Sequence, residues 1–97
     1  MEEHEICDAI HKRRRVRFWY RGDVRTVEPL AFGVGDGGHP ILRAYQVSGF
    51  RSPGEHGWEA FHVEEIKEFA ILDESFENVR TGYMRNDPGM TKLYCEI

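Results

Sequence analysis

The sequence predicts a single, mostly β domain that begins with a short helix. Apolar and polar residues alternate through RVRFWY, residues 15–20, as they do in a strand with one buried face. Arg21-Gly22-Asp23 then supplies turn chemistry and residues 24–27 resume β-favouring side chains, so a hairpin is expected that Pro29 ends. The 97 residues, 40% of them hydrophobic, suffice for one core but not for two.

A helix is expected at the start of the chain and strands over most of the rest. Residues 2–13 have acidic side chains at the start, basic ones at the end and an apolar stripe of Ile6, Ala9 and Ile10, which predicts a helix. Residues 33–38, GVGDGG, are flanked by strands and predict a hairpin turn, not a phosphate-binding loop. Strands are expected at about 15–20, 24–28, 30–34, 40–47, 58–62, 67–72 and 90–97, with loops over 48–57 and 81–89 and a helical turn over 73–80.

The ordered motifs resemble a WYL domain, the small Sm-like or SH3-like barrel of many bacterial transcription regulators. Tyr20, Arg25 and the run Val27-Glu28-Pro29 resemble its opening, and the resemblance continues through the glycine-rich turn, residues 41–45 and residues 61–66. It covers roughly residues 5–76. The resemblance implies one WYL-like domain over residues 1–97, with a helix at 2–13, a barrel at about 15–72 and a C-terminal extension, a strand or tail, at 73–97.

The chain departs from the family pattern in two places. The family's name-giving Trp-Tyr-Leu falls on Pro40, Ile41 and Leu42, so only the leucine is kept. Its two arginines around the closing segment fall on His62 and Glu65. The resemblance implies a sensory module, which in the family is attached to a winged-helix DNA-binding domain. Because 97 residues leave no room for a helix-turn-helix as well, this chain is not expected to read a DNA sequence by itself.

Two overlapping sets of residues are candidate ligand contacts. The first is a basic and aromatic strand surface, where guanidinium groups match phosphate and flat rings stack on bases; a solvated strand face is the alternative. The second is a pocket implied by the resemblance, with half-buried framework residues as the alternative. The first set is Arg15, Arg17, Trp19, Arg25, Arg43 and Tyr45, and the second is Tyr20, Arg25, Arg43 and His62.

The net charge of −4 hides two clusters of opposite sign. Residues 12–25 carry seven basic side chains against one acidic, a net charge of +6, and residues 59–77 carry seven acidic against one basic, a net charge of −6. Such faces can bind an anion or a second copy, or can lie side by side and neutralise each other. A homo-oligomer is expected, because a small barrel leaves strand edges unpaired.

Catalysis, metal binding and a cofactor are not expected. The sequence lacks the Gly-x-Ser-x-Gly, HExxH, P-loop and Rossmann patterns. His4, Cys7 and His11 would share a helix face and have zinc-ligand chemistry, but no fourth ligand is near them, which favours a surface stripe. Cys7 and Cys95 lie at opposite ends and predict reduced thiols. The N-terminus is acidic, where a signal peptide would be basic, and no apolar run approaches the ~20 residues of a membrane span. These two observations predict a cytoplasmic protein.

The predicted function is a ligand-sensing or regulatory module that binds a nucleotide, an oligonucleotide or another anionic ligand in transcription-related regulation. The alternative is a structural module that forms homo-oligomers or docks on a partner protein. Ligand binding requires basic side chains to converge on a concavity, whereas an interaction module needs an exposed apolar surface or strand edge.

Overall fold

The computed structural model describes residues 2–49, 57–83, 85 and 89–97. These residues form a mostly β domain with an N-terminal helix, as the sequence predicts. The elements are α1 (Glu3–His11), β1 (Arg14–Tyr20), β2 (Asp23–Gly35), the 3-10 turn η1 (Asp36–Gly38), β3 (Pro40–Ser48), β4 (Trp58–His62), the 3-10 turn η2 (Val63–Glu65), β5 (Lys67–Ser75) and β6 (Met90–Glu96).

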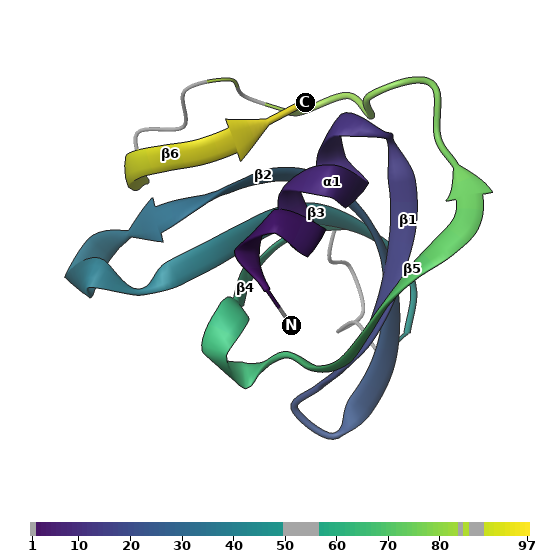
Figure 1. The fold of residues 1–97 in the computed structure, drawn as a ribbon, viewed down its shortest axis with the longest axis horizontal. Helices are drawn as coiled ribbons and strands as arrows, with labels where there is room; N and C mark the ends of the chain where they lie inside the picture. The colour runs from purple at the N-terminus through teal and green to yellow at the C-terminus, as the bar shows by residue number, and fades with distance from the viewer. Residues whose placement is uncertain (1, 50–56, 84, 86–88) are drawn as a thin grey trace.

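The strands form one antiparallel sheet in the order β4-β3-β2-β1-β5, and β6 pairs with β2 (Figure 1). One edge of β2 pairs first with β1, up to Val27, and then with β6, from Ala31 onward. Pro29, which has no N–H to donate, lies between these two ladders and ends the pairing with β1. The prediction of two strands at 24–28 and 30–34 is wrong, because β2 runs through Pro29 while β3 pairs with its other edge.

The sheet is curled but is not closed into a barrel by hydrogen bonds between described residues. β4 and β5 lie at the two ends of the strand order and are joined through η2 without forming a ladder. The molecule nevertheless measures 28 × 28 × 27 Å, which a flat six-stranded sheet would not. Helix α1 lies across the open side of the curled sheet and contacts β1, β2 and β6 (Figure 1).

The core lies between α1 and the concave face of the sheet. Ile6, Ala9 and Ile10, the predicted helix stripe, are all buried. The three rings of Phe18, Tyr20 and Phe61 meet edge to face. The centroid of the Phe61 ring lies 5.0 Å from that of Phe18 and 4.9 Å from that of Tyr20. The predicted apolar face of β1 is therefore the inner face of the sheet.

The structure confirms two predicted hairpin turns and corrects one predicted helical turn. Arg21 and Gly22 have φ of 47° and 85°, the left-handed geometry of a two-residue hairpin, so the predicted turn is confirmed. The hairpin at the glycine-rich run is also found, between β2 and β3. The predicted helical turn over 73–80 is wrong, because β5 extends to Ser75 and residues 76–80 are irregular. Of the predicted loops, residues 50–56, 84 and 86–88 lie outside the described residues.

Candidate functional site

The sheet separates the predicted ligand contacts into groups. Tyr20 and Arg25 lie on the inner side, where the Arg25 guanidinium carbon is 5.2 Å from the centroid of the Tyr20 ring. Residues that alternate with the buried ones lie on the outer face, and these are Arg15, Arg17, Trp19, Arg43 and Tyr45. Five of the six residues of the predicted basic and aromatic surface therefore share the outer face, and Arg25 lies on the opposite face.

The inner group has the geometry of a structural framework. Tyr20 is buried, and its hydroxyl oxygen accepts a 3.0 Å hydrogen bond from the backbone N–H of His62. The Arg25 guanidinium also lies 6.0 Å from the Phe61 ring centroid and 3.5 Å from the side-chain oxygen of Gln46. These contacts occupy the Tyr20 hydroxyl and one terminal nitrogen of Arg25, whereas Arg25 Nε and His62 Nδ1 are buried without a hydrogen-bond partner among the described residues.

His62 contributes its backbone, not its ring, to this group. Its ring meets the ring of His39 edge to face, with centroids 5.8 Å apart. His39 in turn lies 2.9 Å from the Glu64 carboxylate through Nδ1. The structure thus brings Tyr20, Arg25 and His62 together but leaves Arg43 on the other side of the sheet.

The two clusters of opposite charge lie side by side. Pairing of β1 with β5 places the basic stretch against the acidic one, and three ion pairs join them: Arg14 to Asp73 at 3.5 Å, Arg15 to Glu74 at 3.2 Å and Arg21 to Glu65 at 2.9 Å. The hydrogen bonds from Arg21 lower the pKa of Glu65. Intramolecular neutralisation, one of the two alternatives open from the sequence, is confirmed.

Trp19 is the centre of an exposed surface on the outer face. Its cross-strand partner in β2 is Val24, and the two side chains are 39% and 47% exposed. Two open hollows of about 350 and 330 Å³ flank the indole, and Lys67 lines both. Their other charged lining residues are Arg21, Glu64, Glu65 and Glu68. We call Arg17, Trp19, Val24, Lys67 and Glu68 the Trp19 surface.

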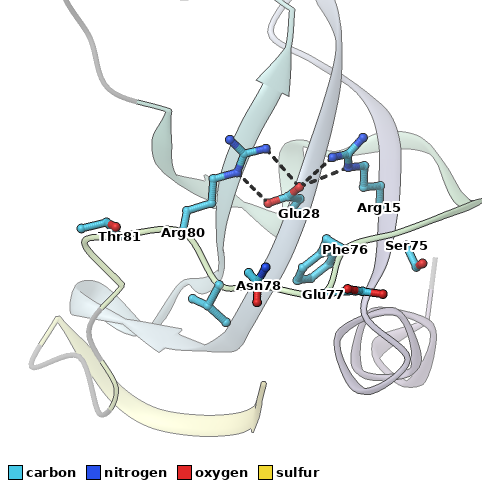
Figure 2. Close-up of a pocket in the computed structure, with 9 residues that line it drawn as sticks. Arg15, Glu28, Ser75, Phe76, Glu77, Asn78, Arg80 and Thr81 are labelled. Atoms are coloured by element: carbon cyan, nitrogen blue, oxygen red, sulfur yellow. Dashed lines mark hydrogen bonds and ion pairs between the residues drawn. The ribbon is translucent and has the colours of Figure 1, made fainter.

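A second cluster lies further along the outer face, around Glu28. The Glu28 side chain is only 3% exposed and lies between two guanidinium groups, Arg15 at 3.0 Å and Arg80 at 3.1 Å (Figure 2). Arg80 also lies over the Tyr45 ring, 4.5 Å from its centroid. The hydrogen bond to Glu28 raises the pKa of Arg80, so this guanidinium stays charged. A hollow of about 600 Å³ opens beside the cluster.

The segment that carries Arg80, residues 76–83, crosses the outer face, and we call it the strap. The buried Phe76 anchors its start, with its N–H 2.9 Å from the carbonyl oxygen of Arg13. Near its end Trp58 Nε1 donates to the Thr81 carbonyl at 3.0 Å, and Tyr83 stacks on the Trp58 ring. The strap therefore covers the outer side of Tyr45 and Trp58, which face each other across β3 and β4.

Sequence reasoning missed Glu28 and Arg80. A signal for Glu28 was present, because the two-residue turn fixes the register that pairs Val16 with Val27 and so sets Arg15 opposite Glu28. Arg80 had no such signal. It reaches Glu28 from 52 residues away, through a segment without regular secondary structure.

Cys7 and Cys95 form a disulfide between α1 and β6, with their Cα atoms 5.8 Å apart. The prediction of reduced thiols is wrong, because β6 pairs with β2 beside the helix and brings the two ends of the chain together. The bridge also occupies the sulfur of Cys7, so Cys7 has no free thiolate to bind zinc together with His4 and His11. Within the described part of the chain, no group of three or more metal-ligating side chains is found.

Comparison with protein-family models, with curated proteins and with solved structures finds no match for this chain. Among the helices of the described residues, none has the length and apolar character needed to cross a membrane.

Proposed function

We propose that this chain is an interaction module, not an enzyme, and that it self-associates through the Trp19 surface. The observation that carries the proposal is the exposed Trp19 and Val24 pair with charged residues of both signs around it. A large aromatic side chain inside a polar rim is the usual anchor of a protein interface. A solvated strand face needs no such apolar centre.

The charges around Trp19 favour a second copy of the same chain. Arg17 and Lys67 supply positive charge, and Glu64 and Glu68 supply negative charge, on one small area. Two copies related by a two-fold axis can place the basic groups of one against the acidic groups of the other. β5 adds a strand edge beside this area, because it ends the strand order and Lys67 pairs with Trp19.

Light scattering tests this assembly. The native chain is expected to be a dimer at about 0.1 mM, a concentration that saturates contacts of micromolar Kd. Trp19→Glu is expected to be a folded monomer. Leu93→Glu is the matched control, since Leu93 on β6 is also 39% exposed but lies outside the Trp19 surface. A monomeric native chain, or a dimer that survives Trp19→Glu, would refute the proposal.

A second candidate function, an anionic-ligand module like the sensory WYL domain, is favoured by one observation on the same surface. Arg17 is exposed, lies two residues from Trp19, and forms no ion pair with any residue that the structure describes. An oligonucleotide could stack a base on the indole and place a phosphate on Arg17. The curled sheet with its long bent β2 supports the finer Sm-like or SH3-like barrel architecture as part of this candidate.

A labelled oligonucleotide distinguishes the two candidates. Binding that is strong at low salt, weak at physiological salt and lost in Arg17→Glu supports the anionic-ligand module. No binding at low salt removes it. A cytoplasmic location belongs to this candidate too, and it requires that the Cys7–Cys95 bridge be reduced in the cell, because disulfides are rare in the cytosol. Alkylation of the protein in cell lysate would measure that redox state.

A further inference from the structure

The strap is held to the outer face mainly through side chains at separate points. Between the Phe76 anchor and Tyr83, the contacts come from Arg13 on the Glu77 carbonyl, from Arg80 on Glu28 and Tyr45, and from Trp58 on the Thr81 carbonyl. Residues 76–80 have neither helix nor strand structure. The strap therefore lies on the sheet in the manner of a bound peptide, with one side chain inserted into a polar and aromatic site.

The groups around Arg80 form a complete guanidinium site. Glu28 accepts hydrogen bonds from Arg80 Nε at 3.1 Å and from a terminal nitrogen at 3.4 Å, which is the fork geometry between arginine and a carboxylate. The Tyr45 ring covers the flat face of the same group. A buried carboxylate and an aromatic face recognise an arginine, whereas a lysine could match neither the fork nor the stacking.

The receptor side of this site is rigid and does not depend on Arg80. Glu28 and Tyr45 are direct partners in the β2–β3 ladder, and Tyr45 pairs with Trp58 in the β3–β4 ladder. Glu28 also keeps its ion pair with Arg15, so removal of Arg80 does not leave a buried charge without a partner. The 600 Å³ hollow bordered by Arg15, Glu28 and the strap leaves this side of the site open to solvent (Figure 2).

We propose that Glu28, Tyr45 and Trp58 form a docking site for an extended, arginine-bearing segment of a partner protein, and that Arg80 occupies this site in cis. The strap itself specifies the sequence pattern of the partner. Arginine fills the carboxylate site, and two residues later only glycine fits, because Gly82 has φ of +102° and an added Cβ would lie 2.9 Å from Trp58 Nε1. An aromatic residue follows, as Tyr83 stacks on Trp58. The partner segment is thus Arg-x-Gly-aromatic.

Occupation in cis controls the apparent affinity for the partner. The strap is tethered at both ends, so it competes at a high effective concentration. A partner peptide binds only the fraction of molecules in which Arg80 has left, and its apparent Kd rises in proportion. Emptying the site by mutation should therefore strengthen binding, whereas a native site that never opens would show no peptide binding before the mutation. The docking site shares no residue with the Trp19 surface, so it does not depend on the proposed self-association.

A synthetic peptide with the strap's own sequence, FENVRTGY, is the probe. The full chain carries Trp19→Phe, so that Trp58 is the single remaining indole and its fluorescence reports on the site. Arg80→Ala in this background is expected to bind the peptide at least about tenfold more tightly than the chain with Arg80 intact. Arg17→Ala is the matched control, because Arg17 is an exposed arginine outside the Glu28 site and should leave the affinity unchanged.

The peptide FENVATGY tests whether arginine is recognised. It should not bind the Arg80→Ala chain, and Glu28→Gln added to that chain should abolish binding of FENVRTGY. Circular dichroism checks that each variant is folded, and Arg80→Gln replaces Arg80→Ala if the latter is not. Equal binding of both peptides, or no binding of FENVRTGY to a folded, emptied site, overturns the proposal.

Discussion

The backbone N–H of His62 donates a 3.0 Å hydrogen bond to the hydroxyl oxygen of Tyr20, and these two residues end strands that are not neighbours in the sheet. β3 and β2 lie between β4 and β1 in the strand order. The bond therefore spans the concave side of the curled sheet. It holds together two strands that no ladder joins, and so it helps to fix the curvature of the sheet over its core.

Tyr20→Phe removes this bond and leaves the His62 N–H without its acceptor. The free energy of unfolding should fall by about 1–2 kcal/mol, the scale for losing a partly buried hydrogen bond while keeping the ring. Urea unfolding followed by circular dichroism measures the change. Tyr94→Phe is the control, since Tyr94 is exposed and its ring keeps its contact with Phe32. Equal stability of Tyr20→Phe and native protein would show that the bond contributes nothing.

The parts of the fold that depend on local pattern could be predicted from the sequence. Alternation gives the buried face of β1, and Arg21-Gly22 gives a hairpin whose register sets every facing pair, including Arg15 with Glu28. The opposite net charges of two segments correctly suggest that they can be neighbours. Each of these inferences needs only neighbouring residues or the sum of charges.

The parts that depend on long-range packing could not be predicted. The strap has no periodicity, so nothing in residues 76–83 reveals that Arg80 reaches Glu28. Cys7 and Cys95 are 88 residues apart, and only the pairing of β6 with β2 brings them together. The sequence leaves Arg25 in both candidate sets, because the choice depends on the rings of Tyr20 and Phe61, which it contacts on the inner side.

Arg25→Ala tests whether Arg25 is a framework residue. Its guanidinium packs on the rings of Tyr20 and Phe61, so its loss should lower the free energy of unfolding by about 1–2 kcal/mol through lost cation–π contact and packing. Arg17→Ala is the matched control on the outer face and should change stability by no more than about 0.5 kcal/mol. If Arg25→Ala is as stable as Arg17→Ala, Arg25 is free to serve a ligand instead.

The disulfide predicts a dependence of stability on reductant. Reduction of Cys7–Cys95 should lower the free energy of unfolding by about 2–4 kcal/mol, because the unfolded chain gains the freedom of a long loop. Urea unfolding with and without a dithiol reductant measures this difference. The double variant Cys7→Ala/Cys95→Ala should be insensitive to reductant. Alkylation of both thiols in denatured, unreduced protein would contradict the bridge.

Tyr83 makes the docking of the strap sensitive to alkaline pH. Burial raises the pKa of Tyr83, and the hydrogen bond that its hydroxyl donates to Glu96 raises it further, against the smaller effects of Arg85 and Arg43. The pKa in the docked state thus exceeds the value of about 10 expected when the strap is released. Protonated Tyr83 favours docking fully below pH about 10, and this contribution is lost as the pH rises through the docked-state pKa.

Trp58 fluorescence, recorded from pH 8 upward in the Trp19→Phe background, follows this release because Tyr83 stacks on Trp58. We expect a transition with a midpoint above pH about 10, the value for an unperturbed tyrosine. In Tyr83→Phe the ring keeps its stacking but has no proton to lose, so this transition should disappear. A transition at the same pH in both proteins would mean that another group, not Tyr83, releases the strap.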